Sequence, residues 1–155
     1  MLYLLCLFLT LHRPTPVLEL KIAPEKQTFE MKEAINLLVS LENKGSLAAV
    51  VDKRFLPGPD ESFGQEITLL VTGPKEHPLP YLVLFEPSTL NPDDLEILGP
   101  RHSLTQTLTL SNAYVFGEEG TYQVQAIYDT TLIQSPVPFW RGRLVSLPIT
   151  FEVRK

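Results

Sequence analysis

The stretch EEGTYQVQAIYD, residues 118–129, decides the fold because it alternates with a period of two. From Tyr122 to Tyr128, every second position is Tyr, Val, Ala or Tyr, and the positions between are polar except for Ile127. Successive side chains of a strand point to opposite faces, so this pattern predicts a half-buried strand that starts at Gly120. None of its residues is an obvious candidate for chemistry. We therefore expect this strand to have a structural role and not to form a functional site.

The same alternation recurs along the chain and predicts further short strands. They lie at residues 17–23, 34–42, 47–55, 65–73, 80–86, 103–111 and 143–155. In the segment 103–111, Gln106 interrupts an otherwise apolar face, and in the last segment Pro148 indicates an edge strand or a bulge. Residues 87–102 are expected to form a loop with one helical turn at 92–96. The chain is therefore expected to be all-β, an antiparallel sandwich of about seven to nine strands.

Composition limits the class of protein. A chain of 155 residues is the size of one domain, and its 14 prolines disfavour long helices. The net charge of -5 disfavours a nucleic-acid partner, because such binding needs a clustered basic surface. The single cysteine, Cys6, excludes an intrachain disulfide, so packing must supply the stability.

Residues 1–15 differ from the rest, and we divide the chain into this apolar segment and a domain at 16–155. The first eleven residues, MLYLLCLFLTL, are too few to span a bilayer as a helix. They resemble the hydrophobic region of a secretory signal without its basic start or its cleavage site. We interpret them as an export signal shortened by a late start codon, with a buried first strand or a membrane-surface anchor as alternatives. The expected location is secreted, periplasmic or in the cell envelope, with a cytoplasmic one left open, and membrane contact would involve only this segment.

The spacing of Glu118, Gly120, Tyr122 and Val124 resembles the immunoglobulin-like signature acid-x-Gly-x-Tyr-x-Cys, with valine in place of the cysteine. The resemblance implies that Gly120 turns the chain into the strand. It also implies that the Tyr122 hydroxyl bonds to backbone upstream, as in a tyrosine corner. Val124 would replace the disulfide with packing. These are structural roles, and they imply an immunoglobulin-like sandwich without a disulfide.

A wider resemblance covers residues 17–153. The run TFEMKEAINLLVSLENKGS, the PY at residues 80–81 and the run GPRHSLTQTLTLSNAYVFGEEGTYQVQAIY resemble the β-sandwich module that precedes the catalytic domain of deuterolysin-like and lysine-specific metallo-endopeptidases. The closing WRGRLVSLPITFEV is similar to the last strand of related bacterial modules. The peptidase needs a His-Glu-x-x-His zinc helix, and no two of the three histidines here stand four residues apart. No catalytic residue is therefore carried over.

Other candidate chemistry is weak. The acids Asp60, Glu61, Asp93, Asp94 and Glu96 offer calcium-binding oxygens, but their spacing matches no calcium loop, and solvated surface acids are the simpler interpretation. The loop histidines at 77 and 102 are interpreted in the same way. We predict no metal, no cofactor and no enzymatic activity.

One cluster, PFWRGR at residues 138–143, combines exposed-looking aromatic and basic residues. It lies between the last two expected strands, where immunoglobulin-like folds often place binding loops. Trp140, Arg141 and Arg143 are therefore the candidate contacts for an unidentified protein or peptide partner. The alternative is that Trp140 covers the end of the sandwich while the arginines keep it soluble. We predict a binding or structural module acting through end loops or an edge strand, or else an accessory or propeptide-like domain of a metallo-endopeptidase.

Overall fold

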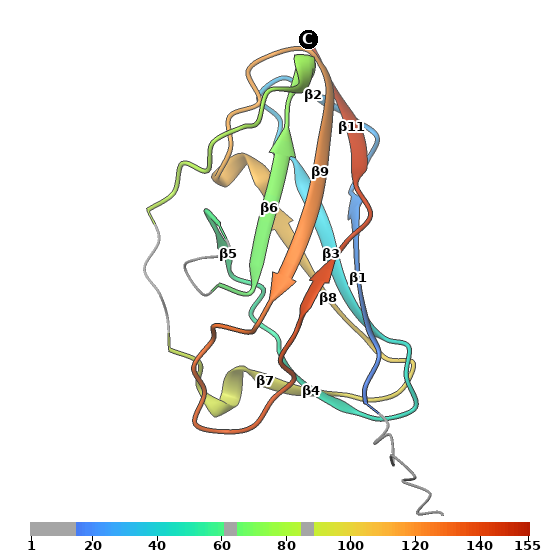
Figure 1. Ribbon diagram of the computed structural model, residues 1–155. Coiled ribbons are helices and arrows are strands. Elements are labelled where there is room, and N and C mark those ends of the chain that lie inside the picture. Colours follow the sequence, from blue (N-terminus) through green and yellow to red (C-terminus); the bar gives the residue numbers. More distant parts are fainter. Residues whose placement is uncertain (1–14, 61–64, 85–88) are drawn as a thin grey trace, which may run out of the picture.

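The computed structural model describes residues 15–60, 65–84 and 89–155, and these form a sandwich of β-strands (Figure 1). The expected all-β fold class is confirmed. The strands are β1 (Leu18–Pro24), β2 (Thr28–Glu30), β3 (Asn36–Asn43), β4 (Ala49–Asp52), β5 (Pro57–Gly58), β6 (Ile67–Thr72), β7 (Leu95–Leu98), β8 (Ser103–Thr109), β9 (Gly120–Asp129), β10 (Arg143–Val145) and β11 (Ile149–Arg154). The 3-10 turns are η2 (Pro74–Glu76), η3 (Pro92–Asp94) and η4 (Leu110–Asn112).

Two sheets form the sandwich, and a small ribbon adds to one end. One sheet has the order β1-β3-β8, and the other has the order β2-β11-β9-β6-β5 with β10 also paired to β9. Strands β4 and β7 pair with each other at the end of the sandwich where β1 begins (Figure 1). All pairs are antiparallel except the short β2–β11 and β5–β6 pairs. The first described residues and the C terminus lie at opposite ends of the sandwich (Figure 1).

Alternation along the strands produces the core between the sheets. On β3, Leu37, Val39 and Leu41 are fully buried. On the opposite sheet, the inward side chains of β9 from Tyr122 to Tyr128 are also buried. Burial of a large apolar side chain stabilises a fold by roughly 1.5 to 3 kcal/mol, so these two strands supply much of the packing energy.

Two segments differ from the sequence-based expectation. Residues 80–84 form no strand; the Leu82 N–H donates to the Ala113 carbonyl at 2.9 Å and the Tyr81 hydroxyl to the Pro57 carbonyl at 3.1 Å. The rest of that expected strand lies outside the described residues. Conversely, the expected loop contains β7, which pairs with β4, and Ile97 on it is exposed. Because β7 has no regularly buried face, its sequence does not show the alternation that predicted the other strands.

Pro148 lies where the last strand is interrupted. Strand β10 pairs with β9 at residues 127–129 and β11 pairs with β9 at residues 120–124. Between them, the Ser146 N–H donates to the Ala126 carbonyl at 2.9 Å, and the Ser146 hydroxyl accepts from the Ala126 N–H at 3.0 Å. Because the side chain and backbone of Ser146 together maintain the link to β9, proline is accommodated two residues later.

The start of β9 has the geometry of a tyrosine corner. Gly120 has a φ of 137°, a region that L side chains rarely adopt, and a Cβ there would lie 2.9 Å from Pro74 Cγ. The Tyr122 hydroxyl donates to the Glu118 carbonyl at 2.8 Å, and its ring stacks on Phe151 with centroids 5.8 Å apart. Val124, where the immunoglobulin signature has cysteine, is fully buried. The corner thus joins the turn before β9 to the core.

We expect Tyr122→Phe to lower the free energy of unfolding by about 1 to 1.5 kcal/mol, because it removes this hydrogen bond and leaves the ring in place. Urea unfolding followed by tryptophan fluorescence measures the change. Phe151→Leu serves as a packing control and is expected to cost at least as much. A Tyr122→Phe variant as stable as the wild type would contradict a stabilising role for the hydroxyl.

Candidate functional site

The loop at residues 130–142, between β9 and β10, is fastened at both ends. The Thr130 hydroxyl donates to the Trp140 carbonyl at 3.0 Å and accepts from the Gly142 N–H at 3.2 Å. The Thr130 N–H donates to the Gly142 carbonyl at 3.0 Å. The Trp140 N–H reaches across to the Val50 carbonyl on β4 at 2.7 Å. These bonds hold the two ends of the loop together and join it to the β4–β7 ribbon.

Trp140 itself is built into this support. Its ring is half-buried, packs against the core and stacks on Tyr128, with centroids 6.0 Å apart and an angle of 22° between the planes. Gly142 lies against the other part of the ring: a Cβ at Gly142 would be 2.5 Å from Trp140 Cζ2. The indole is therefore placed to position the loop, with only part of its surface open to a partner.

Arg141 lies on the exposed side of the same loop. Its guanidinium carbon lies 5.1 Å from the Phe139 ring centroid, and its Nη1 donates to the Thr131 carbonyl at 3.3 Å. Arg143, the third sequence candidate, starts β10, and its Nε lies 3.8 Å from Asp129 Oδ2. Phe139 was not singled out from the sequence, although its position two residues before Arg141 in an extended segment indicates the shared side. Arg141 and Arg143 are both exposed, and Arg141 is the one that lies over an aromatic ring.

We expect Trp140→Ala to lower the free energy of unfolding by about 2 kcal/mol, because it removes a half-buried ring that packs on Tyr128. Arg141→Ala, at the exposed neighbouring position, is the matched control and should change stability by less than about 0.5 kcal/mol. Thermal unfolding of the three chains measures both effects. Equal stability of all three would contradict a stabilising role for the packing of the indole on Tyr128.

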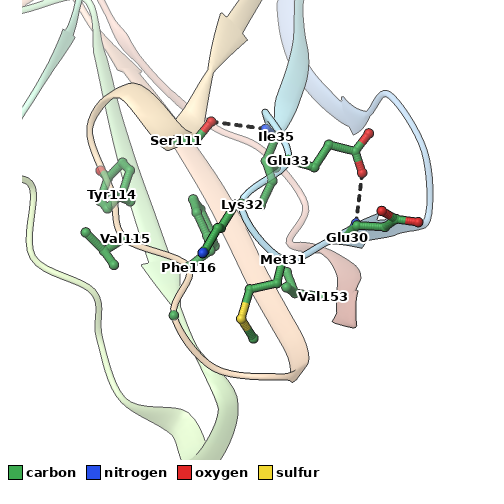
Figure 2. Close-up of a pocket in the computed structure, with 11 residues that line it drawn as sticks. Glu30, Met31, Lys32, Glu33, Ile35, Ser111, Tyr114, Val115, Phe116 and Val153 are labelled. Carbon is green, nitrogen blue, oxygen red and sulfur yellow. Dashed lines mark hydrogen bonds between the residues drawn. The ribbon is translucent and has the colours of Figure 1, made fainter. Parts of the chain in front are cut away.

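A separate pocket of about 480 Å³ lies between the β2–β3 connection and residues 111–117. Figure 2 shows the apolar side chains Met31, Phe116 and Val153 around it. Glu33 accepts a hydrogen bond from the Glu30 N–H at 2.8 Å, so that carboxylate is already engaged in the local turn. Apolar walls with charges of both signs at the rim do not define one ligand chemistry.

A buried ionic cluster lies behind the β4–β7 ribbon. Asp52 at the end of β4 and Glu66 just before β6 are both almost wholly buried. Arg54 binds Asp52 through Nε and Nη2, the latter at 2.8 Å, and Nη2 also binds Glu66. Glu66 accepts from the Leu56 N–H at 2.9 Å, and the Tyr128 hydroxyl donates to the Asp52 carbonyl at 3.0 Å. One guanidinium therefore serves two buried carboxyl groups.

Because Asp52 and Glu66 share the positive charge of Arg54, the protonation of Glu66 is affected. Burial, followed by the hydrogen bond and charge of Asp52, raises the pKa of Glu66 to about 8. Burial opposes the charge of Arg54, but its contacts with Asp52 and Glu66 outweigh this effect and raise its pKa. Burial also raises the pKa of the Tyr128 hydroxyl. Glu66 therefore keeps its proton to a higher pH than an exposed glutamate does, and this proton reduces the negative charge that Arg54 has to balance.

The cluster predicts a pH dependence of stability. In the unfolded chain, Glu66 releases its proton near its ordinary pKa of 4.5. In the folded chain, it retains the proton up to about pH 8. Between these values the folded chain binds more protons. The stabilisation is thus fully present below pH 4.5 and is lost as the pH rises through 8, with a slope approaching about 1.4 kcal/mol per pH unit. Urea unfolding at pH 5 to 8 measures the slope.

Glu66→Gln should flatten this slope because it removes the titrating proton, whereas Glu96→Gln, at an exposed position on β7, should preserve it. A slope unchanged by Glu66→Gln would mean that another group titrates.

The other residues considered from the sequence do not assemble into a site. Asp94 accepts from the Asn91 N–H at 2.8 Å and closes η3, the expected turn. His77 and His102 are exposed, while His12 and Glu61 lie outside the described residues. Over residues 15–60, 65–84 and 89–155, no three His, Cys, Asp or Glu side chains gather as a metal site would require. None of the helical segments in these same ranges is long and apolar enough to cross a membrane.

No protein-family model and no curated protein matches the chain. Among solved structures, it is similar to the CARDB domain of a Pyrococcus furiosus protein, whose crystal structure is described as a complex with di-metal ions. That match has 11% identity and a TM-score of 0.47, and covers 91% of this chain and 96% of that chain. A solution NMR structure of the same domain matches at 13% identity and a TM-score of 0.44, covering 91% and 97%. Likeness at this level transfers no function to the chain.

Proposed function

We propose that the protein is an exported, non-enzymatic β-sandwich module that binds a protein or peptide partner through the loop at residues 130–142. The observation that carries this proposal is the exposure of Arg141 on a loop whose two ends are hydrogen-bonded to each other and to β4. Binding residues are disproportionately found on loops that a rigid scaffold positions. A preorganised loop also loses less conformational entropy when a partner binds.

The chemistry of the exposed side favours a carboxylate-bearing partner. Arginine binds carboxylates through a planar fork, and the contact of the Arg141 guanidinium with the Phe139 ring restricts where that fork lies. Arginine and aromatic residues are also enriched at protein interfaces. Leu132 on the same loop is also exposed and adds apolar surface to it. A peptide with an acidic residue beside an apolar one fits this surface.

A second candidate function is the accessory or propeptide-like domain of a metallo-endopeptidase. It is supported by the sequence resemblance over residues 17–153, and it predicts a zinc-binding helix encoded in frame or in an adjacent gene. Absence of such a helix on both sides would count against it. Export is tested separately, by mass spectrometry of the mature N terminus; an intact Met1 on a cytosolic protein would contradict it.

We expect Arg141→Ala to weaken partner binding by about tenfold or more, because it removes the exposed charged contact. Affinity capture from extracts of the source organism, with quantitative mass spectrometry, identifies proteins enriched by the wild type. Titration with the purified partner then gives the affinity.

Arg154→Ala is the matched control, since Arg154 is exposed at the opposite end of the sandwich and pairs only locally with Glu152. Loss of the partner with Arg141→Ala but not with Arg154→Ala supports the loop. Equal capture by all three chains contradicts it.

A further inference from the structure

Strand β8 has a free edge among the described residues. It pairs only with β3, in a register that places Leu41 opposite Leu104. Bonds just beyond both ends of the ladder fix which residues point toward β3: the Asn43 N–H donates to the His102 carbonyl at 2.9 Å, and the Leu110 N–H donates to the Ile35 carbonyl at 2.8 Å. In an antiparallel pair, every second residue of a strand directs its backbone N–H and C=O groups toward the same neighbouring strand. The even-numbered residues of β8 therefore bond β3, and the odd-numbered ones direct their N–H and C=O groups outward.

The outward edge of β8 lacks the features that usually prevent strands from pairing with other molecules. Such features are charges, prolines, bulges and very short strands. Elsewhere in the described sheets they are present: β1 carries Glu19, Lys21 and Pro24, β5 is two residues long and begins at Pro57, and Pro148 interrupts β10 and β11. Strand β8, SLTQTLT, has seven residues with no charge and no proline. Its edge is chemically open to another strand.

The sequence of β8 indicates which strand could pair with this edge. SLTQTLT reads the same in both directions about Gln106, except that Ser103 stands opposite Thr109. An antiparallel copy centred on Gln106 would face Leu104 with Leu108, and Thr105 with Thr107. Paired threonines stabilise neighbouring strands, and no like charges meet. A register centred on Gln106 also fits the backbone of β8. It places odd-numbered residues opposite odd-numbered residues, and these are the residues whose N–H and C=O groups point outward.

We propose that a second copy of this chain binds along β8, so that the two β1-β3-β8 sheets join into one continuous sheet across a two-fold axis. Such an interface is self-complementary, since each residue that contacts another is contacted by it in return. Each pair of outward residues exchanges two backbone hydrogen bonds across the axis. The proposal does not depend on the loop at 130–142.

A groove beside the edge would add apolar burial. It has a volume of about 340 Å³ and runs along Thr107 to Leu110 and under residues 81–83. Tyr81 and Leu69 line it, and Val83 at its rim is exposed. In the register centred on Gln106, each groove would lie opposite residues 102–105 of the second copy, which would cover part of its apolar surface. A foreign peptide could also use the edge, but the palindrome about Gln106 gives it no advantage over a second copy.

The first experiment measures the mass of the full chain by sedimentation velocity over increasing concentrations. We expect a concentration-dependent species of twice the chain mass of 17.5 kDa. Thr107→Pro should weaken dimerisation at least tenfold, because it removes an outward N–H and no bond to β3. Thr107→Val keeps that N–H and should dimerise as the wild type does. A wild type that stays monomeric up to about millimolar concentration, or dimers unaffected by Thr107→Pro, would overturn the proposal.

The second experiment keeps the proposal testable even if proline disturbs the fold. Thr105 and Thr107 are exposed on the outer face of the sheet, where the Thr105 hydroxyl only donates to the Ser40 hydroxyl, at 3.1 Å. The double variant Thr105→Lys/Thr107→Lys should be monomeric, as should Thr105→Glu/Thr107→Glu, because each places like charges face to face. An equimolar mixture should restore the dimer, since every introduced ammonium then meets a carboxylate. Self-association by either double variant alone, or none in the mixture, would overturn the register.

Discussion

The central position of β9 is the constraint on which the rest of the structure depends. This strand pairs with β6 on one side and with both β10 and β11 on the other, so three other strands take their register from it. A slip of one residue would exchange its buried and exposed faces. Tyr128 near one end resists that slip, because its hydroxyl is bonded to the Asp52 carbonyl on β4. Tyr122 near the other end is held by its ring, which stacks on Phe151 of β11. The strand is thus held near both ends by tyrosine side chains that contact neighbouring strands.

The parts of the fold that could be predicted are those in which one face of a strand is buried. Strand β9 was predicted from 118–129, and β3 from its alternation, because burial and period agree there. Ile127 departs from the pattern: it is buried although it shares a face with Gln125. Strand β7 could not be predicted, because partnership with β4 rather than a buried face holds it in place. The additional short strands β2 and β5 have two or three residues, too few for a period to be recognised.

The site residues follow the same division. Arg141 could be proposed from the sequence because exposed arginine beside aromatics is a local pattern, whereas the support of its loop by Thr130 and Val50 depends on contacts distant in sequence. The Asp52–Arg54–Glu66 cluster escaped sequence reasoning for a similar reason. Acids and bases are ordinary in loops, and only the folded chain shows that two of these acids are buried with one guanidinium. Alternation in the sequence indicates which face of a strand is buried. It does not indicate which polar groups from distant segments meet in the interior of the fold.

The opposite placement of the two ends of the described domain has a mechanical consequence (Figure 1). Strand β1 leads in at one end and β11 leads out at the other, and each is held along its length by an antiparallel neighbour. Tension applied through the two ends would load these ladders in shear, so that several hydrogen bonds would have to break together rather than one after another. Force applied along this axis would therefore meet a paired strand at each end of the domain.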